Sequence, residues 1–161
     1  MTKQEFLQRV IKTITQEREK AEESFATTRQ AAIDAPGAMQ SHSDTTKSQM
    51  SRLAGEIQRS IEEKNFALRT LQSMAYSGLP SDTGVIKVGS VVEVLTERGE
   101  QEIYFILPVG GGIEIVDNEK RILVVTSRAP LTAALLGKRQ GQLIKLQVGP
   151  RQRELTIVNI Q

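Results

Sequence analysis

The sequence has no cysteine and no tryptophan, and its 161 residues include a single histidine, His42. Without cysteine, the chain has no disulfide bridge, thiolate metal site or cysteine nucleophile. With one imidazole it has no site that requires two, and no Ser/His/Asp triad is supported because His42 lies in an expected loop. We therefore expect a protein that is not an enzyme.

Long apolar runs and a strong net charge are also missing. No stretch approaches the ~18–20 apolar residues of a membrane span, and the first ten residues lack the apolar core of a signal peptide. The 21 basic and 19 acidic residues leave a net charge of +2. Bulk attraction to nucleic acid or to an anionic membrane is then not the main driving force. We expect a soluble cytoplasmic protein without a membrane partner.

Glycine and proline are scarce in the first half of the chain and frequent in the second. Residues 2–34 contain neither and are rich in Gln, Glu, Lys, Arg and Ala, which favours one uninterrupted helix. A second helical stretch follows at 47–76. In both stretches apolar residues repeat on average every 3.5 residues, the period of helices that pack on each other.

Each predicted seam has eight positions, of which six are apolar. The first seam consists of Leu7, Ile11, Ile14, Arg18, Ala21, Phe25, Thr28 and Ala32, and the second of Met50, Ala54, Ile57, Ile61, Lys64, Leu68, Leu71 and Ala75. These seams predict an antiparallel coiled-coil hairpin over residues 1–77. A helix of about 32 residues is roughly 48 Å long, so we expect the hairpin to project into solvent.

The tip of the predicted hairpin is the stretch 35–45. Pro36 and Gly37 end the first helix, and Ser43 or Asp44 can cap the second.

After a linker at 78–84, the periodicity changes to short β-branched runs. Six strands are expected, at Val88–Leu95, Glu102–Pro108, Ile113–Val116, Ile122–Thr126, Leu143–Val148 and Glu154–Ile160. One short helix, from Pro130 to Leu136, begins with proline and stops at Gly137. The predicted fold class is therefore α+β: a helical hairpin followed by a small, mostly antiparallel sheet domain with one short helix at 85–161.

Charge is strongly polarised within the second half. Residues 82–119 carry two basic and eight acidic side chains, a balance of −6, whereas residues 120–161 carry eight basic and one acidic, a balance of +7. One interpretation is that neighbouring strands pair these charges as ordinary surface ion pairs. The other is a basic edge around Arg128, Lys138 and Arg139 that meets an acidic partner.

The stretch from Ser127 to Lys138, with its Ser-x-x-Pro-Leu turn and Ala-Leu-Leu-Gly-Lys helix end, is followed by Gly141 and two final strands. Together with the hairpin and the linker, it resembles the Gre-type bacterial transcription elongation factors. The resemblance implies an FKBP-like fold for residues 85–161 and docking of that domain beside the secondary channel of RNA polymerase. The docking residues it implies are Arg128, Pro130, Leu131, Leu135, Leu136, Gly137, Lys138 and Arg139. Alternatively, Leu131, Leu135 and Leu136 are core residues and Gly137 only ends the helix.

In cleavage-competent members of that family, acidic residues at the hairpin tip reach the polymerase active centre and help to hold a catalytic Mg²⁺, which prefers oxygen ligands. Here Gly37–Ser43 replaces the acidic stretch. Asp34 and Asp44 flank the loop and could converge, or they could serve as ordinary helix-end residues. Polar contacts would come from Gln40, Ser41, His42, Ser43 and Thr45. We expect no metal bound by the protein alone, no cofactor, and modulation of transcription rather than cleavage.

The implied partner is RNA polymerase core enzyme, contacted by a monomer that touches nucleic acid only indirectly within the elongation complex. Two other functions fit parts of the sequence. A prolyl isomerase needs an aromatic pocket, but the second half offers only Tyr104 and Phe105, which face opposite sides of one strand. A dimerising coiled coil would leave its seams open to a second chain.

The run Gly110-Gly111-Gly112 suggests a loop between strands rather than a phosphate cradle, because no helix start follows it.

Overall fold

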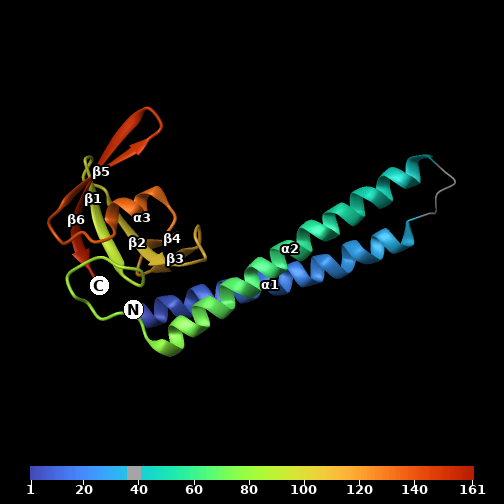
Figure 1. Ribbon diagram of the computed structural model, residues 1–161, viewed down its shortest axis with the longest axis horizontal. Helices are drawn as coiled ribbons and strands as arrows, with labels where there is room; N and C mark the ends of the chain where they lie inside the picture. The colour runs from blue at the N-terminus through green and yellow to red at the C-terminus, as the bar shows by residue number, and fades with distance from the viewer. Residues whose placement is uncertain (36–40) are drawn as a thin grey trace. The chain divides into compact units, whose positions relative to one another are not determined.

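The computed structural model describes residues 1–35 and 41–161, with only the backbone for 41–44. Its elements are α1 (Lys3–Asp34), α2 (Ser41–Ser77), β1 (Val91–Thr96), β2 (Gln101–Leu107), β3 (Glu114–Asp117), β4 (Lys120–Thr126), α3 (Pro130–Leu135), β5 (Leu143–Val148) and β6 (Arg151–Ile160). The fold class is α+β, with two long helices before a six-stranded sheet (Figure 1). In the described part of the chain, neither long helix is apolar enough to cross a membrane.

The chain divides into two compact units. One contains Lys12–Arg69, the larger part of both long helices, and the other contains Met1–Ile11 together with Thr70–Gln161. The start of α1 and the end of α2 therefore belong to the same unit as the sheet, although the sequence suggested a boundary near residue 77.

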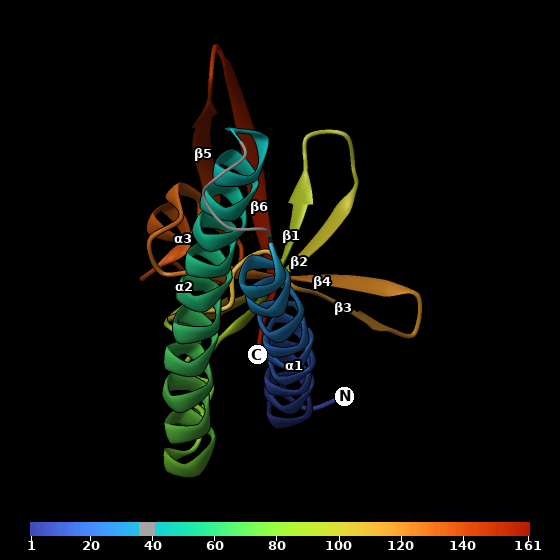
Figure 2. The same cartoon turned by 90° about the vertical axis from the view of Figure 1, so that its right-hand side faces the viewer.

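The unit Lys12–Arg69 is a pair of helices that lie side by side (Figures 1 and 2). All predicted seam positions within it are buried or half-buried. The Nζ atom of Lys64 on α2 lies 3.8 Å from Oε2 of Glu17 on α1, which ties the two helices together at this level. The 3.5-residue pattern correctly predicted which face of each helix is least exposed.

The sheet has the strand order β3-β4-β2-β1-β6-β5. The sheet is mostly antiparallel, as predicted, but it is mixed, because β2 and β4 run parallel. The reason is that β3 lies at the edge and forms a tight hairpin with β4. Asn118 and Glu119 both have positive φ angles, 47° and 67°, as a two-residue type I′ turn requires. The returning strand β4 then fits between β3 and β2.

Both faces of the sheet are covered within its unit. On one face, a cluster that includes Tyr104, Ile106 and Leu155 packs against Leu135 of α3. On the other face, the ring of Phe105 lies 6.4 Å from the ring of Phe6 near the start of α1. Tyr104 and Phe105 thus face opposite sides, as predicted, and both are buried in packing rather than lining a pocket together.

The glycine run 110–112 is the loop that joins β2 to β3. The N–H of Gly112 donates to the carbonyl of Val124, 2.9 Å away. A Cβ atom added at Gly111 would lie 2.8 Å from Cγ2 of Thr126, so only glycine fits this close approach. A strand follows the run, which confirms the interpretation as a loop.

Candidate functional site

The stretch that carries the sequence resemblance forms α3 and the turn after it. Pro130 stands at the start of the helix, where a missing N–H costs nothing. The helix ends at Leu135, one residue earlier than predicted, because Leu136 leaves the helical conformation as its C-cap. Gly137 then adopts a φ of 78°, which favours glycine, and its N–H donates to the carbonyl of Ile86 at 2.9 Å.

The turn after α3 is held from two sides. Ile86 donates its N–H to the carbonyl of Lys138, 2.9 Å away, and Val85 forms an isolated bridge with Arg139. The N–H of Arg139 also donates to the side-chain Oε1 of Gln142 at 2.7 Å. The backbone that presents Lys138 and Arg139 is therefore fixed by its neighbours, and their side chains extend from a rigid base.

The predicted docking residues fall into three groups by exposure. Arg128, Pro130, Gly137, Lys138 and Arg139 are exposed. Leu131 and Leu136 are half-buried and pack against the core cluster, whereas Leu135 is fully buried within it. Leu135 is thus a core residue, in line with the alternative interpretation, and the other seven residues reach the surface to different degrees.

The polarised charges are paired only in part. Lys120 with Glu93, Lys145 with Glu154, and Arg153 with Glu102 form ion pairs at 3.4, 2.9 and 2.8 Å, each between residues on different strands. In the described part of the chain, Arg128, Lys138 and Arg139 form no ion pair, and all three are exposed. The basic edge is therefore not neutralised by the strands around it.

Residues 36–40 of the predicted tip lie outside the described residues, and only the backbone is described for 41–44. Gln40 is among those left out, as are the side chains of Ser41, His42, Ser43 and Asp44. Helix α2 begins at Ser41, so Ser43 and Asp44 lie in its first turn rather than at its N-cap, and Asp44 has the ordinary helix-end place that the sequence also allowed. An aspartate there still suits the positive end of the helix dipole.

Of the remaining tip residues, Thr45 is exposed and Asp34 is the last residue of α1. One carboxylate oxygen of Asp34 accepts a hydrogen bond from Nε2 of Gln30 at 2.9 Å. Within residues 1–35 and 41–161, no three His, Asp or Glu residues are placed to hold a metal ion. Convergence of Asp34 and Asp44 stays a prediction.

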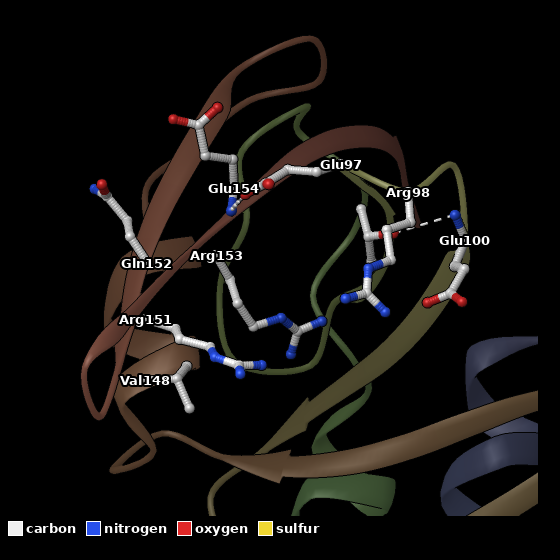
Figure 3. Close-up of a pocket in the computed structure, with 9 residues that line it drawn as sticks. Glu97, Arg98, Glu100, Val148, Arg151, Gln152, Arg153 and Glu154 are labelled. Atoms are coloured by element: carbon white, nitrogen blue, oxygen red, sulfur yellow. Dashed lines mark hydrogen bonds between the residues drawn. The ribbon is translucent and has the colours of Figure 1, made fainter.

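A cleft of about 670 Å³, not predicted from the sequence, lies between the β1–β2 loop and the β5–β6 hairpin (Figure 3). Its charged lining residues are Glu97, Arg98, Glu100, Arg151, Arg153 and Glu154. The guanidinium groups of Arg98, Arg151 and Arg153 point towards its interior (Figure 3). The available signal was the position of arginines beside two glycine turns, Arg98-Gly99 and Gly149-Pro150-Arg151.

Beside this cleft, three side chains form a network. Arg153 Nη2 lies 2.8 and 3.0 Å from the two carboxylate oxygens of Glu102, which also accepts a hydrogen bond from the hydroxyl of Tyr104. Burial, reinforced by this hydrogen bond, raises the pKa of Tyr104 well above its usual value. Although burial disfavours a charged guanidinium, the hydrogen bond and the charge of Glu102 raise the pKa of Arg153.

No protein-family model and no curated protein matches the chain. The solved structures similar to it include transcription factors of the Gre type. GreA factor homolog 1 (Gfh1) of Thermus thermophilus is 18% identical, with 94% of each chain covered and a TM-score of 0.38. Gfh1 of Thermus aquaticus is 21% identical, with 100% of this chain and 96% of that chain covered and a TM-score of 0.40. A GreA/GreB elongation factor from Nitrosomonas europaea is 23% identical, covering 50% of this chain and 63% of that chain, with a TM-score of 0.38. At such low identities and TM-scores, residue roles do not transfer.

Proposed function

We propose that this chain is a Gre-like regulator of transcription elongation that binds RNA polymerase core enzyme and catalyses no reaction itself. The sheet unit, with an FKBP-like domain at its centre, would dock on the polymerase, and the 35–45 tip would enter the secondary channel. The expected output is occlusion or modulation of the channel, because the family's acidic tip stretch is replaced by Gly37–Ser43.

The observation that carries this proposal is the stretch Ser127–Arg139. The residues that resemble the family's docking segment form a proline-started helix and a glycine turn whose backbone is fixed by hydrogen bonds. This turn presents Lys138 and Arg139 to solvent without ion-pair partners in the described part of the chain. Exposed, uncompensated cations on a rigid base suit an acidic partner surface, where they increase the rate of association.

The first test is binding itself. The purified chain is mixed with bacterial core RNA polymerase and analysed by co-purification, and the complex is then assayed for transcript cleavage on a stalled, backtracked template. We expect binding without strong cleavage stimulation. Absence of binding would end the proposal, and cleavage that disappears in an Asp44→Ala variant would refute the modulatory output.

The second test concerns the basic edge. We expect Lys138→Glu combined with Arg139→Glu to weaken polymerase binding by about tenfold or more at low salt, with a smaller effect at high salt, because rim charges act over a Debye length. Arg121→Glu, an exposed charge reversal on β4, serves as the control and is compared with the single Lys138→Glu variant, which changes the net charge by the same amount. Circular dichroism checks that all three variants remain folded. Unchanged affinity of the double variant would remove this edge from the docking surface.

A further inference from the structure

The two edge strands of the sheet, β3 and β5, differ in how the rest of the chain engages them. An edge strand carries backbone N–H and C=O groups without a strand neighbour, and such a row is a template for a further strand. At β3, which has four residues, the carbonyl of Val116 accepts a hydrogen bond from Nη1 of Arg9 at 2.8 Å, so a side chain of α1 engages this edge. Strand β5 has six residues and is the longer edge.

The pairing of β5 with β6 shows which backbone groups of β5 lack a neighbour. The N–H of Ile157 on β6 donates to the carbonyl of Gln142 at 2.9 Å, directly before β5. Because hydrogen-bonded pairs alternate along an antiparallel ladder, every second residue from Gln142 onwards directs its backbone groups to β6. The residues between them direct their N–H and carbonyl groups away from the sheet; they are Leu143, Lys145 and Gln147. Among the residues that the structure describes, these groups have no hydrogen-bond partner, and we call them the free edge of β5.

Exposed apolar side chains lie on both faces of β5. Leu143 is 51% exposed on the face that also carries Lys145, and Val148 is 49% exposed on the opposite face, beside the half-buried Leu146. Cross-strand contacts between aliphatic side chains stabilise a sheet. A strand added at the free edge of β5 would therefore cover apolar surface as well as complete the backbone hydrogen bonds.

The charge on and directly before β5 is positive. No acidic residue occurs from Lys120 to Arg153. Lys145 pairs with Glu154 of β6 at 2.9 Å, which neutralises it in part. Lys138 and Arg139, which precede β5, are exposed and form no ion pair within the described ranges. The surroundings of the free edge therefore favour a segment with carboxylates over one with cations.

Nearby acidic residues do not cancel this charge. Asp82 of the linker binds the N–H of Gly84 at 2.8 Å, and Gly84 lies close to the guanidinium group of Arg139. Counting Asp82 against Arg139 and Glu154 against Lys145 still leaves the charge of Lys138. Two further carboxylates line the cleft between the β1–β2 loop and the β5–β6 hairpin, where they balance the two unpaired arginines of that cleft.

We propose that the free edge of β5 binds an extended segment of a partner protein, which adds as a seventh strand and carries apolar side chains on one face and carboxylates on the other. Backbone groups of the segment pair with those of Leu143, Lys145 and Gln147, and its apolar side chains cover Leu146 and Val148. A second copy of this chain fits less well, because pairing two β5 strands would bring two sets of cations together. The proposal concerns the sheet alone and does not depend on polymerase binding.

The probe is a capped, fluorescein-labelled octapeptide of alternating valine and glutamate, titrated into the full chain at low salt and followed by fluorescence anisotropy. Two comparison peptides are used, one with lysine for glutamate and one with every amide nitrogen methylated. We expect the glutamate peptide to bind, the methylated peptide not to bind, and the lysine peptide to bind about tenfold more weakly or less. In NMR spectra, the glutamate peptide should shift the amides of Leu143, Lys145 and Gln147.

A matched pair of variants at Lys145 isolates the backbone contribution. Lys145→Pro removes an N–H that points away from the sheet, a place where an edge strand tolerates proline. Lys145→Ala loses the same charge and the same ion pair with Glu154 but keeps the N–H. We expect the proline variant to bind the glutamate peptide about tenfold more weakly than the alanine variant, because an added strand loses a hydrogen bond and meets the proline ring. Urea denaturation checks that both variants remain folded.

Four outcomes would overturn the proposal. They are no binding of the glutamate peptide, equal binding of either comparison peptide, equal binding by the two Lys145 variants, and a dimer of the free chain that Lys145→Pro dissociates, since a second copy would then occupy the edge. If the proline variant does not fold, the NMR titration decides, and amide shifts that leave out β5 would place the peptide elsewhere and refute strand addition.

Discussion

At the scale of single residues, Thr132 on α3 is an unusual core position. It is fully buried, and its hydroxyl has no hydrogen-bond partner in the described structure. A buried hydroxyl without a partner has lost its hydration without compensation. Valine has nearly the same shape without the polar atom.

We therefore expect Thr132→Val to raise the free energy of unfolding by about 1 kcal/mol, measured by urea denaturation with an unchanged m-value. Thr132→Ser is the control: it keeps the hydroxyl, removes the methyl group and should lower stability. A destabilised valine variant would mean that the hydroxyl has a partner in solution.

A second residue-scale prediction concerns alkaline pH. Burial and the hydrogen bond to Glu102 raise the pKa of Tyr104 above its unfolded value, so the folded chain holds this proton more tightly. That contribution to stability is complete below about pH 10, the pKa of an unfolded tyrosine, and is lost as the pH rises towards the folded pKa. We expect stability to fall above about pH 10, and Tyr104→Phe to flatten this fall. Tyr76→Phe, which alters a side chain that is 95% exposed, is the control. Identical alkaline curves for both variants would contradict the assignment.

At the scale of elements, the helical seam has a polar interruption. Arg18 and Lys64 are the two charged seam residues, and Lys64 lies beside Glu17, the neighbour of Arg18. The Nε atom of Arg18 is buried without a hydrogen bond and lies 3.6 Å from Glu22. On one side of this level, Ile14 and Leu68 are buried. On the other side Ile61 is buried, but Ala21, Thr28 and Ala32 are only half-buried.

Replacing both charges should tighten the hairpin. We expect the double variant Arg18→Leu with Lys64→Leu to slow amide hydrogen exchange between these residues and the tip. The expected increase in the opening free energy is about 1–3 kcal/mol, because partly buried charges are replaced by apolar contacts. Arg52→Leu removes an exposed pair with Glu56 and should change exchange by at most about 0.5 kcal/mol. If the double variant exchanges no more slowly, the charged seam does not limit the stability of the hairpin.

The elements themselves were largely predictable from the sequence, because each depends on local periodicity. The seams, the six strands and the proline-to-glycine limits of α3 follow from residue spacing, and the ends of the strands and of α3 differ by at most three residues from the prediction. The parallel β2–β4 pair was not predictable, since it depends on where the β3–β4 hairpin inserts. The basic edge was predictable from the positions of charged residues along the sequence. The cleft was not predictable, because Arg98 and Arg151 are 53 residues apart in the sequence and lie near each other only through the pairing of β1 with β6.

At the scale of the whole molecule, the sheet depends on residues from the very start of the chain. Phe6 and Phe105 are 4% and 0% exposed, and their rings are in contact. Polar contacts add to this packing. Nη1 of Arg9 donates to the carbonyl of Val116 at 2.8 Å, and Nζ of Lys3 donates to the carbonyl of Pro80 at 2.7 Å. The dependence of the sheet on the start of α1 was not predictable from the sequence. Glycine and proline content indicated a boundary near residue 77, whereas Met1–Ile11 belongs to the same compact unit as the sheet.

Two truncated chains would separate the sequence boundary from the structural one. The first contains residues 78–161, and the second joins Met1–Ile11 to Thr70–Gln161 through a short Gly/Ser linker. Without Phe6, the face of the sheet around Phe105 is open to water. We therefore expect the first chain to have a free energy of unfolding about 3–5 kcal/mol below that of the second in urea denaturation, the range for removing a buried aromatic side chain. The first chain should also bind the dye ANS.

Point variants of the full chain test the same contact. Phe6→Ala should lower the free energy of unfolding by a similar amount, whereas Phe66→Ala, at a position that is 58% exposed on α2, should lower it much less. Equal stability of the two truncated chains would show that the sheet does not need the start of α1, and that the boundary near residue 77 is also the folding boundary.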